Sequence, residues 1–219
     1  MHSVIKSSFY ITFLVLALVI GVKMLMNSKG NILVKLFALI VLFLGIGEGF
    51  HILPRIMEIF TNDIGTYGPM MKTGRFISSI SIIFVYLLLF DFWRFYYRVS
   101  KVESIKKMLT ILAVIGVILS VVLKDNTGTW YILLRNIPIM LIGFIIIPLY
   151  KKHSASASIK GFKFLWLALL LSLVFTISFE LLSSNFEFFI ILMMPKILMY
   201  IWIVVMGYKA FKQDLMKIS

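Results

Sequence analysis

Residues 188–208 read FFIILMMPKILMYIWIVVMGY, and this stretch decides the class of the chain. A helix of about 20 apolar residues is long enough to cross the hydrocarbon core of a bilayer. One charged residue, Lys196, interrupts the run. A charged side chain at such a depth is costly unless it faces a cavity or a counter-ion. We therefore expect a membrane-spanning helix whose lysine faces a polar site.

The composition extends this reading to the whole chain. Of its 219 residues, 61% are hydrophobic, whereas soluble domains contain about 45–50% apolar residues. The sequence therefore predicts a single integral-membrane domain over residues 1–219. The absence of cysteine excludes disulfides and zinc–thiolate sites. With only three histidines in the chain, we expect no metal site, and we expect no cofactor.

Seven apolar windows are long enough to span a membrane, which predicts an all-α bundle of seven transmembrane helices. The windows are Phe9–Met26, Ile32–Leu53, Phe76–Phe95, Met108–Leu123, Trp130–Tyr150, Phe162–Leu182 and Phe188–Tyr208. Turn-forming residues separate the first two windows, and residues 151–160 are expected to form a flexible loop. Pro138, Pro148 and Pro195 are expected to mark kinks.

The distribution of basic residues predicts the orientation. Seven spans place the two termini on opposite sides of the membrane. One side then carries Lys23, Lys29, Lys35, Arg94, Arg98, Lys101, Lys106, Lys107, Lys151, Lys152, Lys160, Lys163, Lys209, Lys212 and Lys217. The other side carries Lys6, Arg55, Lys72, Arg75, Lys124 and Arg135. By the positive-inside rule, the first side is cytoplasmic, so the N-terminus is outside and the C-terminus is cytoplasmic. Trp93, Tyr96 and Tyr97 would then form an inner aromatic belt, and Trp130 and Tyr131 an outer one.

Polar residues of five spans fall at a common depth between the outer surface and the midplane, at about 1.5 Å of rise per residue. They are Glu48, His51, Arg55, Arg75, Arg135, Asn136, Glu180 and Lys196, and Tyr200 follows Lys196 by one turn. The spacing of Glu48, His51 and Arg55 puts them on one helix face. Charges buried separately would each need a partner, whereas one cavity satisfies them all. The cations outnumber the carboxylates, which favours an anionic ligand.

For several individual residues, a structural or interfacial role is the alternative to a role in a site. Arg55 and Arg75 could snorkel to the headgroups, and Glu180 could lie among them. Lys196 could form a purely structural ion pair with Glu48 or Glu180. Asp91 and Arg94, three residues apart, are expected to form a local ion pair.

Two segments resemble the signatures of a known family. Residues 47–55, GEGFHILPR, resemble G-D-x-F-H-L-x-P-R, and residues 195–208 resemble P-K-x-x-x-Y-x-W-x-x-x-M-G-Y. Both are similar to a family of small uncharacterised polytopic membrane proteins of Gram-positive bacteria. The chain has Glu48 where that motif has aspartate. The resemblance implies that Glu48, His51, Pro54, Arg55, Lys196, Tyr200 and Trp202 are motif positions, and it implies no activity.

Three functions fit these observations. The first is a non-enzymatic protein of the bacterial cytoplasmic membrane, multi-pass, that binds or transports a small anionic or zwitterionic ligand, or a lipid headgroup. The second is a membrane lipid hydrolase in which Glu48 is the general acid and His51 the general base. The third is an accessory or structural subunit whose charges only pair helices. The first is favoured. Nucleic acid is not expected as a partner, because the charge is explained by topology.

Overall fold

The computed structural model describes the backbone of residues 2–61, 66–126, 128–154, 161–182, 192–214 and 216. Side chains are described from residue 7 onward within these ranges, except at 129 and 180–182. The helices are α1 (His2–Met26), α2 (Ile32–Thr61), α3 (Gly68–Tyr96), α4 (Glu103–Val122), α5 (Thr129–Ser154), α6 (Leu165–Leu182) and α7 (Met193–Lys212). The described residues contain no strand, so an all-helical fold is confirmed for them.

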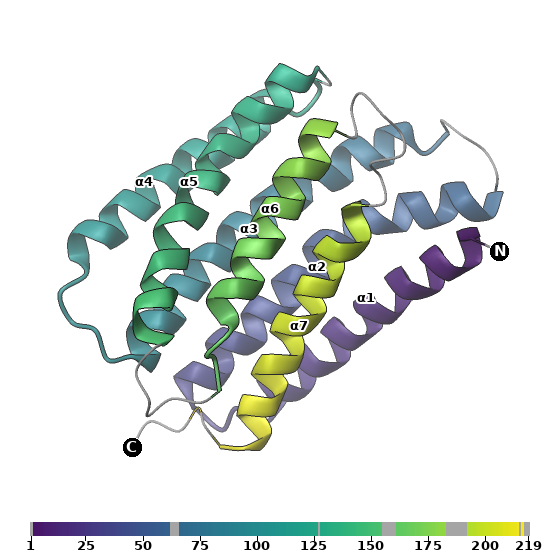
Figure 1. Ribbon diagram of the computed structural model, residues 1–219. Coiled ribbons are helices and arrows are strands. Elements are labelled where there is room, and N and C mark those ends of the chain that lie inside the picture. Colours follow the sequence, from purple (N-terminus) through teal and green to yellow (C-terminus); the bar gives the residue numbers. More distant parts are fainter. Residues whose placement is uncertain are drawn as a thin grey trace.

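The seven helices form an up-and-down bundle (Figure 1). Each helix packs against its neighbours in the chain, and α1 also packs against α7, which closes the ring. Two further contacts, α3 with α5 and α2 with α7, brace it. Asn31, in the turn after α1, donates a hydrogen bond to the carbonyl of Met216, beyond α7, at 2.8 Å. α1 therefore begins at one end of the bundle, and α7 ends at the other.

Six of the helices, α1 to α5 and α7, are long and apolar enough to cross a membrane. The part of α6 whose side chains are described, Leu165–Phe179, is apolar but shorter than a span requires. Large apolar side chains cover the outside of the bundle, for example Val19, Ile118 and Phe144, each more than half exposed. A soluble protein rarely exposes so much apolar surface. The fold is that of a multi-pass integral membrane protein.

Several helices run past the predicted windows. α2 continues from Leu53 to Thr61 through Pro54, α3 begins at Gly68 instead of Phe76, and α5 includes residues 151–154. The apolar windows stopped where charge appears, but charged residues do not end a helix; they only end the part that lipid can cover. The loop expected over residues 151–160 is therefore helical in its first four residues, and the rest lies outside the described residues.

Pro195 requires a correction. It lies in the first turn of α7, which begins at Met193. The N–H groups of a first turn have no partner within the helix, so a proline there breaks no hydrogen bond and no kink is needed. The carbonyl four residues before it, that of Ile191, lies outside the described residues.

Two glycines allow α2 and α3 to approach closely. A Cβ added at Gly47 would overlap the Ser81 side chain, and one added at Gly74 would overlap the carbonyl of Phe50. Pro54 has no N–H to donate to that carbonyl, which lies four residues before it. The carbonyl instead lies against Gly74. This close packing sets α3 beside the polar face of α2.

An aromatic cluster fills the bundle where α3 and α5 end and α6 begins. Phe37, Phe92, Tyr96 and Phe162 pack ring against ring, with centroids 5.1–5.2 Å apart. Trp93 is buried as well and donates its Nε1–H to the carbonyl of Leu149 at 3.1 Å. The prediction that Trp93 and Tyr96 belong to an interfacial belt is therefore wrong. Both lie on the face of α3 that packs inward, and their rings serve helix packing.

Candidate functional site

A cavity lies inside the ring of helices, in the space between α2, α3, α5, α6 and α7. The space open to the centres of water molecules is about 50 Å³. Its lining comprises Ile40, Leu44, Glu48, His51, Arg75, Ser78, Ser79, Ile82, Val85, Tyr86, Leu89, Asn136, Ile139, Leu169, Ser172, Leu173, Thr176, Lys196, Tyr200 and Ile203. One water needs about 10–15 Å³ by this measure, so the cavity holds several waters or a small polar group.

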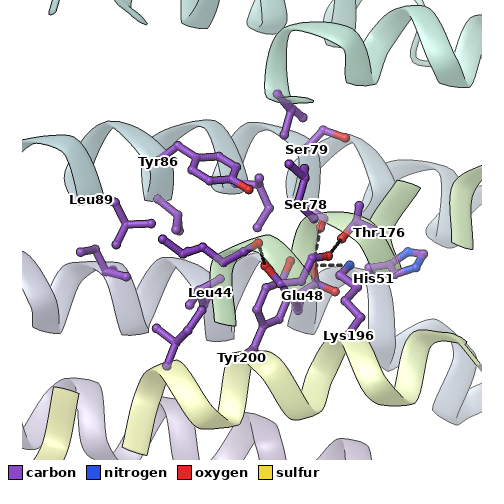
Figure 2. A pocket seen from close by; sticks show the side chains of 18 of the residues that line it. Leu44, Glu48, His51, Ser78, Ser79, Tyr86, Leu89, Thr176, Lys196 and Tyr200 are labelled. Carbon is purple, nitrogen blue, oxygen red and sulfur yellow. Dashed lines mark hydrogen bonds and ion pairs between the residues drawn. The ribbon is translucent and has the colours of Figure 1, made fainter. Parts of the chain in front are cut away.

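Polar and apolar residues occupy opposite ends of this cavity. Figure 2 shows Glu48, Ser78, Thr176 and Lys196 together at one end and Leu44, Tyr86 and Leu89 towards the other. The ionisable side chains of the lining are Glu48, His51, Arg75 and Lys196, with the two buried tyrosines. The cavity is therefore itself amphipathic.

The centre of the polar end is an ion pair between α2 and α7. Lys196 Nζ donates to Glu48 Oε1 at 2.8 Å, and both residues are buried, with 6% and 1% of their surface exposed. Glu48 lies 16 residues after the start of α2, and Lys196 lies 16 residues before the end of α7. Both are therefore about 24 Å from the end of the bundle that these helix termini share. The sequence left Glu48 and Glu180 open as partners of Lys196, and the structure shows the pair with Glu48.

Glu48 has further capacity for hydrogen bonds. The Ser78 hydroxyl of α3 also donates to Oε1, at 3.1 Å. The other carboxylate oxygen, Oε2, is buried and has no hydrogen-bond partner among the described residues. A buried carboxylate oxygen without a donor is costly, so a water or a ligand donor in the cavity is required to satisfy it.

Positively charged and amide side chains line the same cavity as the Glu48 carboxylate. Arg75, from the start of α3, lines it, and its Nε is buried without a hydrogen-bond partner in the part of the chain described. Asn136 lines it from α5 and donates its side-chain N–H to the carbonyl of Ile132 at 2.9 Å. Lys196 also lies over the ring of Tyr200, 5.5 Å from its centroid.

His51 lines the cavity, but no hydrogen bond joins its described side chain to that of Glu48. Its Nδ1 is buried with no partner among the described residues, and its ring meets Phe179 edge-on, with centroids 6.4 Å apart. Of the predicted cations, Arg75 and Lys196 line the cavity together with His51.

Not all of the predicted residues line the cavity. Arg55 is half-buried and lies over the ring of Phe179, 5.5 Å from its centroid, while Arg135 is buried outside the cavity lining. Both make further interactions. The side chain of Glu180 lies outside the described residues. Six of the nine predicted residues thus line the cavity: Glu48, His51, Arg75, Asn136, Lys196 and Tyr200.

Several hydroxyl groups were missed as site residues. Ser78, Ser79, Ser172, Thr176 and Tyr86 line the cavity. The signal was present in the sequence as hydroxyl residues one turn apart within apolar windows. Such residues are ordinary in membrane helices, where a hydroxyl bonds to its own helix backbone. Ser172 and Thr176 do so, donating to Leu169 and Ser172 carbonyls at 2.8 Å.

Within the described residues, no group of three or more histidine, aspartate or glutamate side chains is arranged to hold a metal ion. Asp91 and Arg94 form the expected local ion pair, 3.9 Å apart, towards the other end of α3. It is partly exposed and contributes little to stability.

Comparison with known proteins finds no family model, no curated protein and no solved structure that matches this chain. The fold and the site alone define the class: an all-helical, multi-pass membrane protein with a polar cavity inside the bundle.

Proposed function

We propose that this protein binds or transports a small anionic or zwitterionic ligand in its intramembrane cavity. One observation carries the proposal. Glu48 Oε2 and Arg75 Nε are both buried, both lack a partner among the described residues, and both belong to residues that line one cavity. A ligand with an anionic group for Arg75 and a donor group for Glu48 would satisfy both atoms together.

The burial of the ion pair supports this proposal. A buried ion pair is about neutral for stability when compared with well-packed apolar residues. Membrane helices carry ionisable residues mainly where these serve a site. The presence of Lys196 and Glu48 in otherwise apolar helices therefore favours a role in binding over a role in holding α2 against α7.

The hydrolase alternative has weaker support. In both described hydrogen bonds of the Glu48 carboxyl group, with Lys196 and with Ser78, Oε1 accepts, so neither contact shows it acting as a proton donor. No hydrogen bond joins Glu48 to His51, whose side chains the structure describes. If the protein were only an accessory subunit, water alone would have to form hydrogen bonds with Glu48 Oε2 and Arg75 Nε.

A stability screen of the purified protein tests the proposal. The panel contains phosphate, small carboxylates, amino acids and glycerophosphocholine. A ligand at 100 times its dissociation constant stabilises the native state by about 2.7 kcal/mol. The matched variants are Arg75→Gln and Lys72→Gln, which removes an exposed charge one turn earlier on the same helix.

We expect at least one member of the panel to stabilise the wild type and the Lys72→Gln variant. Arg75→Gln should weaken its binding by about tenfold or more, since an arginine hydrogen bond to an anion contributes about 1.5–3 kcal/mol. No response to any member, or an equal response in both variants, would count against the proposed function.

A further inference from the structure

A narrow crevice between α5 and α6 adjoins the cavity. We call it the α5/α6 crevice, and its lining is Leu133, Asn136, Ile139, Met140, Leu173, Thr176 and Ile177. Asn136, Ile139, Leu173 and Thr176 line the cavity as well. The remaining three, Leu133, Met140 and Ile177, are half-buried. The crevice thus leads from the cavity wall towards the outside of the bundle.

The surface of this crevice is apolar despite its two polar residues. Asn136 donates its amide N–H to the Ile132 carbonyl, and Thr176 donates its hydroxyl to the Ser172 carbonyl. Each of these two residues directs one donor to its own helix, and the remaining surface of the crevice is almost entirely hydrocarbon. The crevice therefore suits a hydrocarbon chain better than a charged or strongly hydrated group.

The outer edge of the crevice faces lipid if the bundle spans a membrane. Exposed apolar side chains flank it on α5 and α6, namely Leu134, Ile137, Leu141 and Val174. The space in the crevice is about 20 Å³. Since one water centre needs about 10–15 Å³, this is room for one or two methylene-sized groups at a time and not for a chain to be stored there.

We propose that the ligand is a single-chain amphiphile: an anionic or zwitterionic headgroup in the cavity, with its alkyl chain leaving through the α5/α6 crevice into the bilayer. This inference rests on the function proposed above. Lipid chains are as apolar as leucine side chains, so a chain gains little by leaving the bilayer. A lateral exit lets the headgroup reach Arg75 and Glu48 while the rest of the chain stays in lipid. Single-chain phospholipids and fatty acids share this chemistry.

Photo-cross-linking in lipid nanodiscs tests this placement. Two probes, a single-chain phosphocholine and a fatty acid, each carry a diazirine at mid-chain, and mass spectrometry maps the labelled residues. We expect at least one probe to label the crevice edge, at Leu133, Met140 or Ile177, above the level at lipid-facing residues such as Val15 of α1 and Ile118 of α4. The probe that does so identifies the headgroup class. Uniform labelling by both probes over the bundle surface would overturn the inference.

A matched pair of variants on α6 provides the second readout. Ile177→Trp fills the outer part of the crevice, whereas Val174→Trp places the same indole ring one turn away on the exposed surface of α6. Labelling of Leu133 and Met140 should fall by about tenfold in the first, because the indole occupies the space that the chain would need. It should be unchanged in the second. Equal labelling in the two variants would refute the crevice route, and the wild-type map decides the matter if Ile177→Trp does not fold.

Water-soluble headgroup analogues distinguish a failure of this inference from a failure of the proposed function. If glycerophosphocholine or a short carboxylate stabilises the protein through Arg75, but the long-chain probes label the surface uniformly, the cavity binds a small solute and only the inference fails. If neither soluble headgroups nor chain-bearing probes respond to Arg75→Gln, the proposed function fails with it.

Discussion

At the scale of single residues, the Glu48–Lys196 pair dominates the energetics of the site. Both side chains are almost fully buried and 2.8 Å apart. Removing one partner of such a pair strands the other charge, which costs more than the pair contributes. Stability and ligand binding therefore have to be measured separately for any change at these positions.

Lys196→Met should lower the free energy of unfolding by about 3–5 kcal/mol, because it leaves the Glu48 carboxylate buried without its cation. Adding Glu48→Gln should recover most of this loss. The recovered double variant should still not respond to the ligand that stabilises the wild type. Unfolding in mixed micelles measures the stability, and the screen described above measures binding. A double variant with both stability and ligand response restored would show that the pair is only structural.

Ser78→Ala removes the hydroxyl that donates to Glu48 Oε1 at 3.1 Å. Hydrogen bonds to charged groups contribute about 1.5–3 kcal/mol, so a loss towards the lower end is expected while Lys196 remains. Ser79→Ala is the control, because that hydroxyl donates to the backbone carbonyl of Arg75 at 2.9 Å. The same unfolding measurement should find Ser79→Ala close to wild type. Equal effects would mean that Ser78 does not support the carboxylate.

The sequence could identify Lys196 and Glu48 because a charge in an apolar window is conspicuous. It could not choose between Glu48 and Glu180 as the partner of Lys196, since both were expected at a similar depth. Nor could it separate Arg75, which lines the cavity, from Arg135, which does not. That difference depends on how each helix is rotated about its axis, and rotation is set by packing between helices rather than by depth.

At the scale of elements, the contact between α2 and α3 positions the site. It brings Ser78 to Glu48, and it depends on Gly47 and Gly74, where a Cβ would overlap atoms of the facing helix. Hydropathy could predict that these helices exist but not that they touch so closely. The predicted windows also ended at charged residues. They therefore omitted the last part of α2, which contains Pro54, and the start of α3, which contains Gly74. Gly74 is the residue against which the Phe50 carbonyl lies.

Gly74→Ala should destabilise the bundle by about 1–3 kcal/mol, because its Cβ would overlap the Phe50 carbonyl and force the helices apart. Gly49→Ala on α2 is the matched control. A Cβ there would meet Leu14 Cδ2 at 3.5 Å, which is an ordinary contact, and alanine favours helix over glycine by about 1 kcal/mol. Gly49→Ala should therefore be neutral or stabilising. Thermal unfolding of the two variants measures the difference, and a neutral Gly74→Ala would show that α2 and α3 adjust freely.

At the scale of the whole molecule, the up-and-down arrangement gathers many of the basic residues at one end of the bundle. The turn after α1 and the ends of α3, α5 and α7 share one end of the bundle. Basic residues lie at each of these places, for example Lys29, Arg98, Lys152 and Lys212. The ion pair lies about 24 Å from that end, given about 1.5 Å of rise per residue. The orientation of the bundle therefore decides from which side a ligand reaches the cavity.

We expect the basic end to be cytoplasmic and the N-terminus to be outside, because positive charge is retained on the cytoplasmic side during insertion. The cavity would then lie in the outer half of the membrane. A reporter that is active only in the cytoplasm should work when fused after Ser219. The same reporter fused after Asp125, in the turn between α4 and α5 at the other end of the bundle, should be inactive. The reverse pattern would invert the bundle and place the cavity nearer the cytoplasm. Activity at both positions would mean that an even number of spans separates them, which would exclude α5, α6 and α7 all crossing the bilayer.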